Sequence, residues 1–177
     1  VFAADHGDLY GEHARMNKGT VHEASAKVPF VMAHGKNRQD PLIPRGKVVP
    51  QAANTTDWMP TFLSLLKAPC PEVPGRDLTP LLAAEPPADW HDVTFSTLWF
   101  VAAIDAQHKL VLMAKNQPWL LDNEADPDEL VNFYEDPAYA PTVQRLARDM
   151  QKFMTGCDLS NKWVSAQLED ILKPQRQ

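Results

Sequence analysis

The first half of the chain alternates short apolar runs with longer polar stretches. Residues 1–4 are small or apolar without polar alternation, which is typical of a strand covered on both faces, as in a parallel sheet. Gly7 supplies the turn that ends this strand. A second apolar run at residues 28–33 predicts another strand. The polar residues 9–26 between the two runs predict a loop with a short helix, and residues 34–47 predict an exposed loop.

The middle of the chain carries one helical pattern followed by a proline-rich stretch. Apolar residues recur at helical spacing over residues 56–66, and Thr56 or Asp57 is a suitable N-cap. Residues 67–89 are rich in proline, with a short helical piece at residues 78–84. This stretch is the best candidate for a boundary between two units.

The last third combines strand patterns with helical patterns. Residues 93–101 and 109–113 are rich in β-branched and aromatic side chains, and residues 119–122 form a third short strand candidate. Their spacing predicts an antiparallel meander. Residues 139–154 predict an amphipathic helix, and residues 159–172 predict a last helix with a weaker pattern.

Composition excludes several classes of protein. The 177 residues are 44% hydrophobic, enough for a sizeable core, and the formal net charge is −6 with scattered Lys and Arg, which argues against a nucleic-acid-binding surface. Cys70 and Cys157 are too few and too far apart for a disulfide framework or a zinc site. The sequence has no apolar run of about twenty residues, so it predicts no membrane span.

Asp5 and His6 are the first candidate site residues. They follow the first predicted strand, and ligands of open α/β sheets bind beyond the carboxyl ends of strands. Where the strand breaks into a turn, both side chains can converge on one ion. A carboxylate with an imidazole suits a divalent metal, and oxygen-rich surroundings favour calcium or magnesium over zinc. The structural alternative is that Asp5 caps a turn and His6 packs against it.

The polar loop that follows offers further candidates. Lys18 can reach back toward the first strand as a point charge for an anion, or it can be a solvated surface lysine. His13 and His22 can each hydrogen-bond a substrate or simply lie in the loop. Glu23 can brace the loop instead of acting as an acid.

Several short motifs follow one another in a definite order. They include Asp-His-Gly-Asp, Gly-Glu-His, Lys-Gly-Thr, Asp-Trp-Met-Pro-Thr, Gly-Arg-Asp-Leu and Asp-Pro-Asp-Glu-Leu-Val-Asn, at residues 5–8, 11–13, 18–20, 57–61, 75–78 and 126–132. In this order the motifs resemble the C-terminal part of a formylglycine-dependent sulfatase of the alkaline-phosphatase-like superfamily. The resemblance covers nearly all of residues 1 to 155.

The resemblance implies an α/β fold in two parts. Residues 1–85 would be the C-terminal portion of an alkaline-phosphatase-like mixed sheet flanked by helices. Residues 86–155 would form a small α+β subdomain, an antiparallel meander plus a long helix, and residues 156–177 a C-terminal tail.

The resemblance also implies a site. In this family a calcium ion is held by two early aspartates, a formylglycine and a later Asp with Asn or His, and Asp5 and His6 match the later pair; magnesium is the alternative ion. Lys18 matches the lysine that contacts the sulfate oxygens. His13 and His22 would contact the substrate or leaving group.

The family's nucleophile segment, Cys/Ser-x-Pro/Ala-Ser-Arg, does not occur in this sequence. We therefore expect a fragment whose nucleophile lies upstream, and which is inactive alone. The implied function is hydrolysis of a small-molecule or glycan sulfate ester. The alternatives are a phosphonate or phosphodiester hydrolase of the same superfamily, and a non-catalytic module that binds sulfated ligands.

Overall fold

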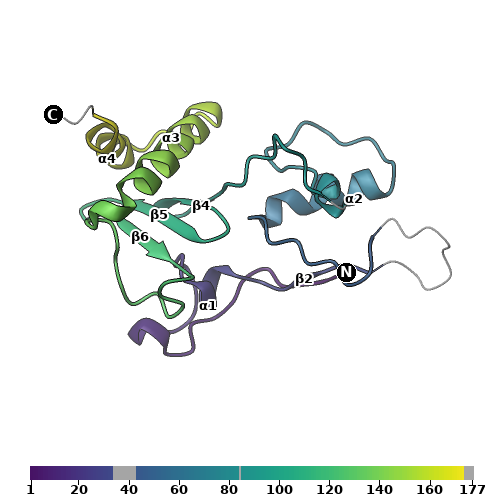
Figure 1. Cartoon of the computed structure of the whole chain (residues 1–177), viewed down its shortest axis with the longest axis horizontal. Coiled ribbons are helices and arrows are strands. Elements are labelled where there is room, and N and C mark those ends of the chain that lie inside the picture. Colours follow the sequence, from purple (N-terminus) through teal and green to yellow (C-terminus); the bar gives the residue numbers. More distant parts are fainter. Residues whose placement is uncertain (34–42, 84, 174–177) are drawn as a thin grey trace.

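The structure is a computed structural model that describes residues 1–33, 43–83 and 85–173 (Figure 1). Most of the loop predicted at residues 34–47 lies outside the described residues. The architecture is α/β, as predicted. A four-stranded sheet with helices against it forms one side of the molecule, and α2 with its long connections forms the other.

The sheet is an antiparallel meander in chain order, which confirms the predicted topology. The predicted strand at residues 93–101 is two strands, because a tight turn at Leu98 and Trp99 lets Thr97 pair with Val101. That turn contains no Gly, Pro, Asn or Asp, so the sequence carries no signal for it. The strands are β3 (Thr94–Thr97), β4 (Phe100–Ile104), β5 (His108–Met113) and β6 (Trp119–Asp122).

Two helices cover one face of this sheet (Figure 1). They are α3 (Ala140–Gly156), which follows the short 3-10 helix η4 (Pro137–Tyr139), and α4 (Lys162–Leu172). Both predicted C-terminal helices are thereby confirmed. Their buried side chains meet alternate residues of the strands and form the main core, which includes Leu110, Leu112, Leu146, Met150, Val164 and Leu168.

The opposite face of the sheet is covered by the segment that leads into α1 (Glu23–Ala26). Val21 packs there against Val111 and Met113, which alternate along β5 with the residues that face the helices. The central strand β5 is therefore buried on both faces. This contact joins the N-terminal segment to the C-terminal sheet.

The first predicted strand differs from expectation. β1 (Phe2–Ala3) pairs antiparallel with β2 (Phe30–Val31), and each strand has two residues. Within the described residues neither strand is covered on both faces, since Phe2 is 67% exposed and Val31 is also exposed. An uninterrupted apolar run does not reveal whether other chain segments cover its two faces.

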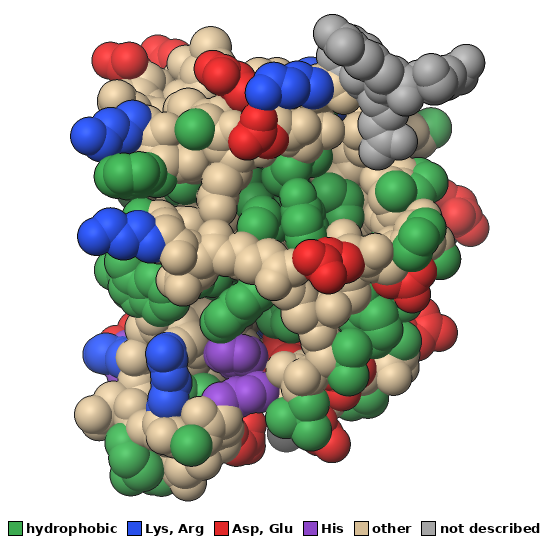
Figure 2. Space-filling model, turned by 90° about the vertical axis from the view of Figure 1, so that its left-hand side faces the viewer, with side chains coloured by type: hydrophobic (Ala, Val, Ile, Leu, Met, Phe, Trp, Pro, Cys, Tyr) green, Lys and Arg blue, Asp and Glu red, His purple; other side chains and the backbone are tan. Residues whose placement is uncertain are grey.

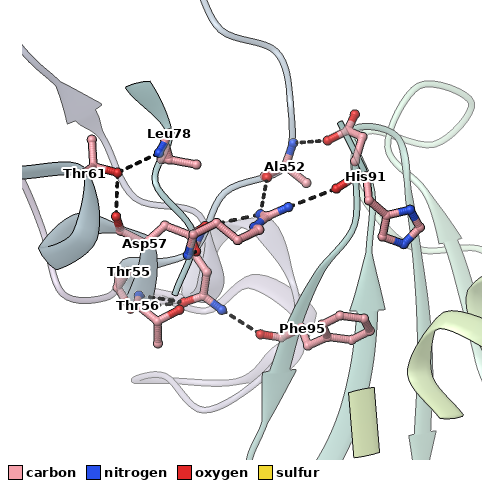
Figure 3. Close-up of polar contacts among 11 residues, drawn as sticks. Ala52, Thr55, Thr56, Asp57, Thr61, Leu78, His91 and Phe95 are labelled. Carbon is pink, nitrogen blue, oxygen red and sulfur yellow. Dashed lines mark hydrogen bonds and ion pairs between the residues drawn. The ribbon is translucent and has the colours of Figure 1, made fainter. Parts of the chain in front are cut away.

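The segment around α2 is held together by an ion pair between Arg76 and the buried carboxylate of Asp57 (Figure 3). Nη2 of Arg76 donates to Oδ2 of Asp57 at 3.2 Å and to the Ala52 carbonyl at 2.9 Å, and Nη1 donates to the His91 carbonyl at 3.0 Å. Nδ2 of Asn54 donates to the Phe95 carbonyl of β3 at 2.6 Å. Arg76 thus links the α2 segment to the chain that enters the sheet and acts as a packing residue.

The helices of this segment begin close to where the pattern places them. Asn54 caps the first turn through a capping box with Asp57, two positions before Thr56, the earlier of the two predicted caps. The elements are the 3-10 helix η2 (Thr55–Asp57), α2 (Trp58–Leu65) and the 3-10 helix η3 (Thr79–Leu82); a further 3-10 helix, η1 (Glu12–Ala14), lies in the N-terminal loop. Among the described residues, no helix has the length and apolar character needed to cross a membrane.

Candidate functional site

Asp5, His6 and Lys18 lie together. Nζ of Lys18 contacts Nε2 of His6, and Oδ2 of Asp5 lies 3.5 Å from the same nitrogen. All three side chains line a hollow of about 1440 Å³ that extends to β3. The lysine and the acid–imidazole pair are distant in the sequence, but they face one space.

The hydrogen bonds of His6 define its chemistry. Nδ1 lies 2.7 Å from the Gly7 carbonyl, which can only accept, so Nδ1 carries the proton and Nε2 keeps its lone pair. Metal-binding histidines are commonly oriented in this way by a hydrogen bond to a backbone carbonyl. Backbone N–H groups of Asp5 and His6 hold the pKa of the Asp5 carboxyl below its ordinary value. A neutral Nε2 and an ionised carboxylate fit a divalent cation.

The short helix α1 positions both parts of the site. The buried Ser25 accepts a hydrogen bond at its carbonyl from the Gly7 N–H at 2.9 Å, and another at its hydroxyl from the Gly19 N–H at 3.1 Å. Gly7 follows His6, and Gly19 follows Lys18. A Cβ atom at Gly7 would lie 2.0 Å from the Ala24 carbonyl oxygen, so only glycine permits this close approach.

His13 and His22 lie apart from this group. Their rings stack on each other with centroids 3.8 Å apart, and His22 also contacts Trp119 of β6. Neither histidine lines the hollow that Asp5 and Lys18 face. Figure 2 shows histidine side chains gathered low on one face of the molecule, near Lys and Arg side chains.

His22 predicts a pH dependence of stability. It is only 6% exposed, and burial, with the neighbouring His13, lowers the pKa of His22 from 6.5 to about 4. Below pH 6.5 the unfolded chain therefore binds a proton that the folded protein does not, so stability present above that pH is lost as the pH falls toward 4. We expect the loss from this residue to be on the order of 3 kcal/mol.

Urea unfolding between pH 7 and pH 4 tests this expectation. The free energy of unfolding of the His22→Gln variant should fall less steeply with decreasing pH than that of the parent. His13→Gln should lose only part of the slope, because His13 is the smaller of the two causes that lower the pKa of His22. Equal slopes for the parent and His22→Gln would contradict the assignment.

Within the described residues, no group of three or more His, Cys, Asp or Glu side chains could hold a metal ion. Asp5 and His6 form a pair, which is at most about a third of the six to eight ligands that a calcium ion takes. Cys70 and Cys157 are free and exposed, in agreement with their spacing in the sequence. The pair can therefore act as a metal centre only together with further ligands.

The chain belongs to the family described as N-sulphoglucosamine sulphohydrolase, C-terminal, whose model matches residues 11–156. This finding, with the fold, confirms the predicted C-terminal part of a sulfatase of the alkaline-phosphatase-like superfamily. Two relatives are each 29% identical. They are the multifunctional alkaline phosphatase superfamily protein PehA of Trinickia caryophylli, matched over 84% of this chain, and an arylsulfatase of Clostridium perfringens, matched over 88%.

Solved structures share the fold. One, of a protein in complex with its substrate D-glucosamine-2-N,6-O-disulfate, matches 86% of this chain and 33% of its own at 22% identity and a TM-score of 0.68. A phosphonate monoester hydrolase of Agrobacterium radiobacter matches 88% of this chain and 34% of its own at 25% identity, also with a TM-score of 0.68. The chain spans about a third of the length of its relatives, 32% of PehA and 33% of the arylsulfatase.

Proposed function

We propose that the protein containing this chain is a sulfuric ester hydrolase, and that this chain supplies the later metal ligands and a sulfate-contacting lysine. The observation that carries the proposal is the convergence of Asp5, His6 and Lys18 on one hollow, in a chain with an arylsulfatase among its relatives. The nucleophile, a formylglycine in this proposal, would come from residues outside this sequence.

Asp5 and Nε2 of His6 would hold the metal, with calcium as the proposed ion and magnesium as the alternative. The bound cation would polarise the ester and orient it. The Asp5 carboxylate contributes negative charge, whereas the neutral imidazole contributes a directed lone pair. The hydrogen bond from Nδ1 to the Gly7 carbonyl keeps that lone pair aimed at the ion.

Lys18 would stabilise charge on the substrate. As the ester bond breaks, its electron pair passes to the leaving oxygen, and a fixed ammonium group that also offsets the charge of the sulfuryl oxygens lowers the energy of that state. In the structure Nζ of Lys18 contacts Nε2 of His6, the atom that would bind the metal. A bound cation would take the place of the ammonium group at Nε2, and Lys18 would then turn to an anion bound beside the metal.

The substrate class we propose is a sulfate ester of a small molecule or a glycan. A structural neighbour was solved with a sulfated glucosamine as its substrate, which is consistent with this class. The second candidate is a phosphonate or phosphodiester hydrolase. It is favoured by the likeness to the phosphonate monoester hydrolase, because a sulfate ester and a phosphonate ester present similar tetrahedral anions to the same lysine and metal.

The test compares two substrates with the protein expressed from the complete reading frame that contains this chain. We expect kcat/KM for 4-nitrophenyl sulfate to exceed that for 4-nitrophenyl phenylphosphonate. Dialysis against EDTA should abolish activity, and calcium should restore it better than magnesium. The reverse substrate preference would establish the second candidate. Binding of a sulfated glycan without hydrolysis of either ester would instead identify a non-catalytic binding module.

A further inference from the structure

We propose that Lys109, on β5, and Glu129, in the loop after β6, are positioning residues for the site: they fix α1, which in turn holds the Asp5–His6 pair and Lys18. The proposal rests on the proposed function, because it assigns these residues a role in that site. Neither side chain contacts Asp5, His6 or Lys18 directly.

Lys109 is a buried cation with a complete set of acceptors. It is 2% exposed and lies on β5, on the sheet face turned toward the N-terminal segment. Nζ donates to the Val21 carbonyl at 2.9 Å, to Oε1 of Glu129 at 2.7 Å and to Oε1 of Glu23 at 2.6 Å. Three acceptors match the three N–H bonds of the ammonium group.

Glu129 completes the link to α1. Its Oε2 accepts a hydrogen bond from the backbone N–H of Glu23 at 2.6 Å, at the first residue of the helix. The backbone of Glu129 has φ of 53°, a left-handed conformation that is unfavourable for a glutamate. Such a strained backbone persists only where the surrounding structure stabilises it, so the contacts around Glu129 fix the position of its side chain.

Glu23 receives charge from two lysines. Burial acts to raise the pKa of the Glu23 carboxyl, but the hydrogen bonds from Lys109 and Lys27 outweigh it and hold that pKa below the ordinary value. The side chain of Glu23 is therefore ionised and paired at neutral pH. The network joins three segments that are distant in sequence, at residues 21–27, 109 and 129.

Ser25 of α1 connects the helix to the site through two hydrogen bonds. Its carbonyl and hydroxyl hold the N–H groups of Gly7 and Gly19, the residues that directly follow His6 and Lys18. A shift of α1 would therefore move the Asp5–His6 turn and the Lys18 loop. Small displacements of reacting groups are costly, since about 1 Å can lower a rate by about 10²-fold.

The chemistry of the network favours positioning over stability. Burying charges costs desolvation energy, and apolar side chains of similar volume often stabilise a fold equally well. Apolar packing is not directional, however, and would not fix the position of residues 21–23 relative to β5. The ionic groups bind the Val21 carbonyl and the Glu23 N–H in fixed directions, and so determine where α1 begins.

The test uses the double variant Lys109→Met/Glu129→Gln in the complete protein. The double change removes one charge of each sign, and the glutamine side chain can still accept from the Glu23 N–H. Arg145→Gln is the matched control, because Arg145 forms an ion pair with Asp105 beside the same sheet and makes no hydrogen bond or ion pair with residues 5–25. Amide hydrogen exchange at Gly7 and Gly19 is measured with kcat and with the calcium concentration that gives half-maximal activity, below the melting temperature of each variant.

We expect exchange at both glycines to rise at least about 10-fold in the double variant, kcat to fall about 10-fold, and the half-maximal calcium concentration to rise about 10-fold. The control should stay near the parent in all three. Unchanged exchange at Gly7 and Gly19, or faster exchange with unchanged kcat and calcium dependence, would overturn the proposal. If the parent hydrolyses no sulfate ester, the proposed function fails, and the exchange measurement alone still decides whether these residues fix the two loops.

Discussion

Replacing Lys18 with methionine in the complete protein is expected to lower kcat for sulfate ester hydrolysis by about 10²–10³-fold. The substitution removes the ammonium group that contacts Nε2 of His6 and faces the hollow, while it keeps most of the length of the side chain. The ammonium group is expected to act most strongly in the transition state, where charge moves to the leaving oxygen, so kcat should fall more than KM rises. Steady-state kinetics with 4-nitrophenyl sulfate at saturating calcium measures both.

Lys115→Met is the matched control for this prediction. Lys115 is an exposed lysine in the turn after β5, away from the hollow, and its replacement should leave kcat within about twofold of the parent. Arginine at position 18 should restore only part of the rate, because a planar guanidinium does not reproduce a compact ammonium charge. A Lys18→Met variant with parental kcat would contradict the assignment of Lys18 to the sulfate.

Sequence periodicity predicted the helices and strands in which a single spacing of apolar residues continues from the first residue to the last. α3 shows a clear apolar stripe, and β5 and β6 carry short apolar runs bounded by turn residues. The turn between β3 and β4 was missed because apolar residues run through it. The apolar run at residues 1–4 could not show how far β1 is buried, since burial depends on which other segments pack against a strand.

The candidate site, too, was predicted only in part from the sequence. The sequence placed Asp5 and His6 at a strand end, but only the motif order linked them to Lys18. What joins them is a loop with left-handed backbone at four residues other than glycine, together with hydrogen bonds to Ser25. No local pattern signals those conformations. The four residues are Tyr10, His13, Ala14 and Asn17.

Lys109 and Glu129 carried no signal that a single sequence could reveal. Lys109 begins an apolar run, where a lysine usually lies at an exposed strand end. Its carbonyl partner, Val21, is 88 residues away in the sequence. Glu129 appeared only as one member of the Asp-Pro-Asp-Glu motif. Their pairing follows from the docking of the N-terminal segment on the sheet, which is a tertiary property.

Gly7→Ala is expected to lower kcat by about 10²-fold, because it displaces Asp5 and His6, the proposed metal ligands, from Lys18. The added Cβ would lie 2.0 Å from the Ala24 carbonyl oxygen and 3.0 Å from its carbon. Since these are backbone atoms, no side-chain rotation relieves the clash, and α1 must move away from the Asp5–His6 turn. Overpacking of this kind also costs about 1–3 kcal/mol of stability.

Gly156→Ala is the matched control, because a Cβ there meets nothing within 4 Å. At the last residue of α3, alanine should raise the free energy of unfolding by up to about 1 kcal/mol and leave kcat unchanged. Urea unfolding and steady-state kinetics on both variants separate the effects. If Gly7→Ala lost stability but kept its kcat and calcium dependence, α1 could shift without moving the ligands. The contact between Gly7 and α1 would then support the fold alone, and Asp5 and His6 would have to be oriented by other contacts.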